Sequence, residues 1–294
     1  MDEVIRNKHK SGIRRGHQYL LGLQDDREVW TNGKRINNVT THPSTMRCAQ
    51  TLAGFLDKQS EAKYKQKLTY IDDDGIRCAI SFKPPKSVDD IKARGQAYYE
   101  WAKWSNGMFG RTPDYKNASI MSFAIAKSWL DKGSKKGLSR TCFSENIKNY
   151  YDFVRTNDKV LTHTLVNPQK SYQVALEGKY DNEVALHIVK ENDSGIIVKG
   201  ARLLATLGPI ADEIEVFPST LLKGNKDNIP FAFAFALPIC TPGIKLIARD
   251  TYDHGKSNFD APLSSRYEEM DAVVIFDNVL VPWERVFMYR EPLL

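Results

Sequence analysis

The chain has 294 residues, of which 41% are hydrophobic and 27% charged, and its formal net charge is +6 at pH 7. This composition excludes a chain that is disordered throughout, because it can bury a core, and the length fits one large domain or two modest ones. The positive charge is scattered and forms no basic patch with interleaved aromatics, so we expect no nucleic-acid partner.

Cysteine spacing and hydropathy narrow the class of protein further. The four cysteines, Cys48, Cys78, Cys142 and Cys240, lie far apart with no C-x-x-C pair, which argues against a structural zinc site or a disulfide scaffold. The charged N-terminal segment lacks the apolar stretch of a secretory signal, and the longest apolar run, 231–240, is too short to span a bilayer. We therefore expect a reduced, cytoplasmic protein without a membrane segment.

The first half of the chain reads as helical. A capping box of the S-x-x-D type, Ser87 to Asp90, predicts the start of a long helix. Its apolar stripe is predicted to pack in the core and consists of Ile91, Ala97, Tyr98, Trp101 and Trp104. Similar periodicity predicts helices over 16–24, 43–57, 117–130 (capped by Asn117 or Ser119) and 144–157.

The second half changes to short β-type runs separated by turn residues. The run FAFAFA alternates with period two, which predicts a strand with Phe231, Phe233 and Phe235 on one face and alanines on the other. We therefore expect a mainly helical domain over 1–160 and a compact antiparallel β domain over 161–294. The predicted strands are 184–189, 195–206, 213–220, 231–239, 244–250 and 271–281.

Three short polar stretches are candidates for a site. GRTPDYKN (110–117) places Arg111 and Tyr115 around a turn, and LTHTLVNPQ (161–169) contains His163 at the predicted domain junction. From the residues alone, an ordinary turn is the default interpretation of the first stretch, and a structural histidine is favoured over a functional one in the second. The third stretch, 205–220, brackets a strand with hydroxyl groups, which usually cap turns. The residues of interest beyond those named are Gln169, Thr206, Ser219 and Thr220.

These stretches resemble the oxygenase component of two-component flavin monooxygenases of the 4-hydroxyphenylacetate 3-hydroxylase family. The likeness spans nearly the whole chain and includes GHQYLLGLQDDREVWTNGKRINNVTTHP (16–43), KGARLLAT (199–206) and PLSSRYEEMDAVVIFDNVLVPWERVF (262–287). It implies an α+β protein of acyl-CoA dehydrogenase-like architecture. That architecture has an N-terminal helical domain, a middle antiparallel β-barrel-like domain and a C-terminal helical bundle, which is apparently missing here.

The resemblance also implies a reaction. Members hydroxylate a phenol such as 4-hydroxyphenylacetate at the ortho carbon, using O₂ and reduced FAD through a flavin hydroperoxide. A separate NAD(P)H-dependent flavin reductase supplies the reduced FAD in a transient encounter. The bundle of the longer members forms a homo-oligomer, a tetramer or dimer, and completes the flavin site.

Site residues follow from the same resemblance. Arg111, Tyr115 and His163 match positions that contact the phenolic oxygen, where a cation and two hydrogen-bonding groups favour the phenolate. The matches for flavin contact are His163, Gln169 and Thr206, and those for the far end of the substrate are Ser219 and Thr220. No metal site is implied.

Three alternatives stay open at this point. The chain could be a truncated or degenerate non-catalytic fragment of the family. A flavoprotein like 4-hydroxybutyryl-CoA dehydratase is disfavoured because no cysteine ligand for its iron–sulfur cluster occurs between Cys78 and Cys142. An acyl-CoA dehydrogenase proper would need a catalytic glutamate that the bundle usually supplies.

Overall fold

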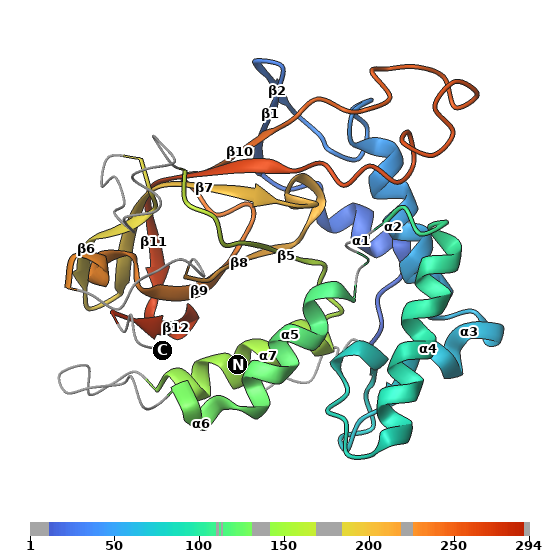
Figure 1. Ribbon diagram of the computed structural model, residues 1–294, viewed down its shortest axis with the longest axis horizontal. Helices are drawn as coiled ribbons and strands as arrows, with labels where there is room; N and C mark the ends of the chain where they lie inside the picture. Colours follow the sequence, from blue (N-terminus) through green and yellow to red (C-terminus); the bar gives the residue numbers. More distant parts are fainter. Residues whose placement is uncertain are drawn as a thin grey trace, which may run out of the picture.

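The computed structural model describes residues 12–109, 112, 114–130, 142–168, 184–218 and 226–290, and combines two larger β-sheets with flanking helices (Figure 1). The helices are α1 (Gly16–Gly22), α2 (Met46–Lys58), α3 (Ala62–Leu68), α4 (Val88–Trp104), α5 (Tyr115–Ile125), α6 (Lys127–Leu130) and α7 (Phe143–Thr156). None of these described helices has both the length and the apolar character needed to cross a membrane.

Ten of the described strands build the two larger sheets. The six-stranded sheet has the order β2-β1-β10-β11-β7-β6, and the four-stranded sheet has the order β12-β9-β8-β5. A short hairpin of β3 (Thr69–Ile71) and β4 (Arg77–Ala79) stands apart from both. The larger sheets consist of β1 (Glu28–Thr31), β2 (Lys34–Ile36), β5 (Leu161–Thr164), β6 (His187–Asn192), β7 (Gly195–Ala205), β8 (Glu213–Val216), β9 (Phe233–Pro238), β10 (Ile244–Ala248), β11 (Ala272–Pro282) and β12 (Val286–Tyr289).

Strand β9 is buried on both of its faces, which explains the alternation of phenylalanine and alanine. Phe233 and Phe235 belong to the main core, where the Phe235 ring meets the Phe276 ring of β11 edge-on at 5.9 Å between centroids. Ala234 and Ala236 point the other way, into a second core formed with α5 and α7. The four-stranded sheet therefore lies between the six-stranded sheet and these helices, and alanine leaves room on the helical side.

The predicted helices are present, with two differences in detail. Ser87 Oγ accepts a hydrogen bond from Asp90 N at 3.2 Å, which confirms the capping box of α4, but Ile91 on the predicted stripe is 59% exposed. The helix predicted over 117–130 is instead two helices: α5 begins at Tyr115, after Asp114, and ends at Ile125, and α6 follows. Asn117 does not cap α5, because its side chain is buried and donates to Ser81 Oγ at 3.0 Å.

The expectation of an antiparallel, barrel-like β domain is wrong in two respects. The described strands form no closed barrel, and two of their pairings, β1 with β10 and β5 with β8, are parallel. Between β5 and β8 the chain visits the other sheet through β6 and β7, so it returns to run in the same direction. Strands β1 and β2 come from the half predicted to be mainly helical; the division at residue 160 stays a prediction.

Candidate active site

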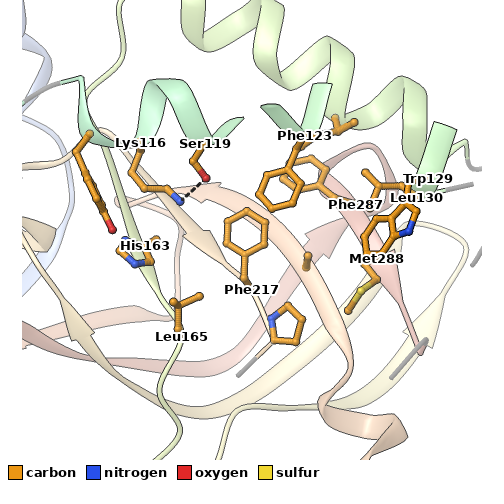
Figure 2. A pocket seen from close by; sticks show the side chains of 14 residues that line it. Lys116, Ser119, Phe123, Trp129, Leu130, His163, Leu165, Phe217, Phe287 and Met288 are labelled. Carbon is orange, nitrogen blue, oxygen red and sulfur yellow. Dashed lines mark hydrogen bonds between the residues drawn. The ribbon is translucent and has the colours of Figure 1, made fainter. Parts of the chain in front are cut away.

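A largely apolar cavity of about 390 Å³ lies between α5–α7 and the helical side of the four-stranded sheet (Figure 2). Its polar members gather where α5 begins and β5 passes. Tyr115, Lys116 and Ser119 come from α5, and His163 comes from β5. The apolar lining is Phe123, Trp129, Leu130, Ile147, Leu165, Phe217, Pro218, Ala234, Phe287 and Met288.

Tyr115 and His163, which sequence comparison paired, border this one cavity. Their ring centroids are 5.5 Å apart with the planes tilted by 44°. Tyr115 is the first residue of α5 and is 39% exposed, and His163 is the third residue of β5. The structure thus brings together two residues that are 48 positions apart (163 − 115), while their contact with a substrate stays a prediction.

His163 and Leu165 also border a second cavity of about 370 Å³, which contains Thr206 at the end of β7. The Thr206 hydroxyl donates a hydrogen bond to Asp271 Oδ1 at 2.6 Å, and its carbonyl accepts one from Thr162 Oγ1 at 2.5 Å. Because the Thr206 hydroxyl donates its proton to the hydrogen bond with Asp271, it can act toward a ligand only as a hydrogen-bond acceptor. The second cavity therefore presents a fixed hydrogen-bond acceptor beside an imidazole.

Four of the predicted site residues, Arg111, Gln169, Ser219 and Thr220, lie outside the described residues. Their roles stay predictions. Asp114, which belongs to the turn predicted at 110–117, is buried, and the burial raises the pKa of its carboxyl to about 6 against the opposing hydrogen bond from Thr112 Oγ1 at 2.5 Å.

Sequence analysis did not identify the most deeply buried charged pair of this site. Lys116 Nζ lies 2.9 Å from Glu215 Oε2, with the two side chains 5% and 0% exposed. Glu213 and Glu215 alternate with Ile214 and Val216, a pattern typical of a strand with one solvated face, yet all four are buried. The sequence feature that could have pointed to Lys116 is its place directly after Tyr115 in the GRTPDYKN stretch.

Residues 15–288 match the model of the 4-hydroxyphenylacetate 3-hydroxylase N-terminal family. The chain belongs to this family. It is 42% identical, over 280 residues, to the 4-hydroxyphenylacetate 3-monooxygenase oxygenase component of Geobacillus sp. (strain PA-9), with 95% of this chain and 55% of the relative covered. The chain thus spans about half the length of the curated relatives it matches.

Solved structures of the 4-hydroxyphenylacetate 3-hydroxylase family have the same fold as this chain. A crystal structure of the oxygenase component of 4-hydroxyphenylacetate 3-monooxygenase, complexed with FAD and 4-hydroxyphenylacetate, superposes with a TM-score of 0.85 at 42% identity. The match covers 94% of this chain and 56% of that one. An archaeal 4-hydroxybutyryl-CoA dehydratase from N. maritimus superposes with a TM-score of 0.80 over 94% of this chain and 54% of that one, at 16% identity, and so shares the fold alone.

Proposed function

We propose that this protein acts as the oxygenase part of a two-component monooxygenase that uses reduced FAD and O₂ to hydroxylate a phenol, such as 4-hydroxyphenylacetate, at the ortho carbon. The observation that carries the proposal is the position of His163, which borders both an apolar cavity with Tyr115 and a second cavity with Thr206. Family membership supports it, since the relative complexed with FAD and 4-hydroxyphenylacetate has the same fold.

The first cavity suits an aromatic ring that carries one polar group. Phe123 and Phe217 stack at 5.1 Å between centroids and form an apolar wall, whereas Tyr115 and His163 supply hydrogen-bonding groups at the other end. A phenol would place its oxygen at that polar end, where Arg111 adds a cation in our proposal. Stabilising the phenolate there would enrich the ortho carbon in electrons.

The second cavity suits the ring system of a flavin. A flavin ring has several N–H groups and carbonyls along one edge, and the acceptor hydroxyl of Thr206 and the imidazole of His163 offer matching contacts. When bound, reduced FAD would supply the electrons that activate O₂. The protein residues would orient the phenol toward it and exclude water, for which the apolar lining of the first cavity is suited.

Further parts of the proposal rest on the family alone. Gln169 would contact the flavin, and Ser219 and Thr220 would bind the far end of the substrate; Pro218, directly before them, lines the first cavity. The partner would be an NAD(P)H-dependent flavin reductase, and the whole protein would be a cytoplasmic homo-oligomer with an acyl-CoA dehydrogenase-like C-terminal bundle.

A reductase-coupled assay with a panel of phenols tests the function. We expect His163→Ala and Arg111→Ala to lose most of the ortho-hydroxylated product, while the dissociation constant of FAD changes much less. Trp129→Phe serves as a conservative control in the same cavity. Product yields equal to wild type in both alanine variants would refute the site assignment.

A non-catalytic role is the alternative that the sequence left open, and it makes a different prediction. Anaerobic titration with reduced FAD separates the two. Binding without turnover of any phenol would favour the non-catalytic role, and product formation would exclude it.

A further inference from the structure

Lys116 lines the first cavity, and its ion-pair partner Glu215 is fully buried behind it. Lys116 Nζ lies 2.9 Å from Glu215 Oε2, 3.3 Å from Ser119 Oγ and 4.9 Å from the centroid of the Phe217 ring. Within the described part of the chain, neither carboxylate oxygen of Glu215 accepts a hydrogen bond from a backbone amide or a hydroxyl. Among the described residues, Lys116 is therefore the cation that compensates the charge of Glu215.

The strand register places this pair next to His163. In the parallel pairing of β5 with β8, His163 is opposite Glu215, so their side chains lie on the same face of the sheet. Ala236 of β9 is opposite Glu215 on the other side, and its small side chain leaves the space that Lys116 enters. In Figure 2 the Lys116 side chain extends from α5 into the cavity, toward the space between His163 and Phe217.

Besides His163, two further titratable groups lie near Glu215, namely Glu213 and Tyr150. Glu213, two residues earlier on β8, pairs with Arg285 at 2.8 Å. Tyr150 of α7 is neutral, because burial and the nearby Glu213 and Glu215 raise the pKa of its hydroxyl well above the ordinary value. Among the described residues that line the first cavity, Lys116 alone has an ammonium group.

We propose that the Lys116–Glu215 pair takes up the proton that a phenol loses when it binds in this cavity, so that the phenolate forms without a change in the net charge of the site. This inference rests on the proposed function. Lys116 would contact the phenolic oxygen, and Glu215 is a positioning residue that acts through Lys116.

The proton transfer balances without any further reactant. The O–H bond of the phenol breaks, and its electron pair stays on the phenolate oxygen. Its proton goes to Lys116 Nζ while the ammonium passes one of its own protons to Glu215 Oε2 across the 2.9 Å contact. The starting state is a neutral phenol with a salt bridge, and the final state is a phenolate beside an ammonium and a neutral carboxylic acid.

Burial gives the physical reason for such a transfer. An added negative charge in an apolar cavity is costly unless counter-charges balance it, and protonation of Glu215 frees the Lys116 ammonium to join Arg111 of the proposed site in balancing the phenolate. Burial raises the pKa of the Glu215 carboxyl, which the Lys116 ammonium opposes, so that this acid accepts a proton more readily than an exposed glutamate.

The test measures the protons released when the intact protein, without flavin, binds a nitrophenol whose neutral and ionised forms absorb differently. A weakly buffered solution with a pH indicator is held below the pKa of the free probe. We expect wild type to bind the nitrophenolate with almost no proton released, and Glu215→Gln to release about one proton per bound nitrophenolate. Glu213→Gln, the same change on the same strand but in the pair with Arg285, is the matched control and should behave like wild type.

Each alternative result overturns the inference. Release of about one proton by wild type, a bound probe that stays neutral, or no release by Glu215→Gln would refute it while leaving phenol binding intact. Failure of wild type to bind the probe would instead refute the proposed function as well. If Glu215→Gln does not fold, the infrared difference spectrum of wild type decides: binding must produce the carbonyl band of a protonated carboxylic acid, and its absence overturns the inference.

Discussion

Replacing Lys116 with methionine should destabilise the fold in a strongly pH-dependent way. The change keeps the length of the side chain but leaves the fully buried Glu215 without its cation. Glu215 would then fold as the neutral acid, and the cost is that of protonating a carboxyl whose ordinary pKa is 4.5. Each pH unit above the ordinary pKa adds about 1.4 kcal/mol to that cost. The upper bound is therefore about 5 kcal/mol at about pH 8 and about 0.7 kcal/mol at about pH 5.

The sign follows from proton linkage. In the variant the pKa of Glu215 is raised in the folded state, so the folded protein binds more protons than the unfolded chain, and stability falls as the pH rises above the unfolded value. Urea unfolding followed by tryptophan fluorescence at both pH values measures the effect. The double variant Lys116→Met/Glu215→Leu is the control, and it should recover most of the loss at the higher pH.

Two results would refute this reasoning. An equal loss of unfolding free energy at both pH values would show that methionine disturbs packing and that Glu215 does not titrate. A double variant no more stable than Lys116→Met at the higher pH would show that the uncompensated carboxyl is not the source of the loss.

Three further changes test other parts of the structure. Ser87→Ala removes the hydroxyl that caps α4 and should lower the unfolding free energy by about 1 kcal/mol; an unchanged urea midpoint would contradict the cap. Thr206→Val removes the acceptor hydroxyl of the second cavity and should raise the dissociation constant of FAD about tenfold by equilibrium dialysis, and no change would exclude Thr206 from the flavin site. Burial raises the pKa of the Glu213 carboxyl from 4.5 to about 7, although Arg285 opposes the shift. The folded state therefore binds a proton that the unfolded chain has lost, and the unfolding free energy should fall by about 3 kcal/mol as the pH rises from about 4.5 to about 7. Glu213→Gln should flatten that slope in urea titrations at several pH values, and a slope like that of wild type would point to another group.

The sequence by itself determined the local elements and the family. Apolar periodicity indicated α7 and the burial of Ile147, Tyr150 and Val154, because a helix with one apolar face must pack that face away from water. The alternation FAFAFA indicated β9 in the same way, since side chains of a strand point to opposite faces, but the strand begins at Phe233 and Phe231 ends a 3₁₀ helix before it. Long motifs such as GRTPDYKN indicated the family, which the match over residues 15–288 confirmed.

Only the tertiary structure decided which distant residues meet and which charges are buried. The short strands β1 and β2 lacked a strong pattern, and their place in the six-stranded sheet depends on the pairing of β1 with β10 across more than two hundred residues (245 − 28). The family resemblance had already paired Tyr115 with His163, and the structure supplies the physical reason, because α5 crosses the face of the sheet on which His163 lies. Lys116 and Glu215 were indistinguishable in sequence from solvated charges. Helices on one side and a second sheet on the other enclose β8, and this enclosure makes the two charges a buried pair.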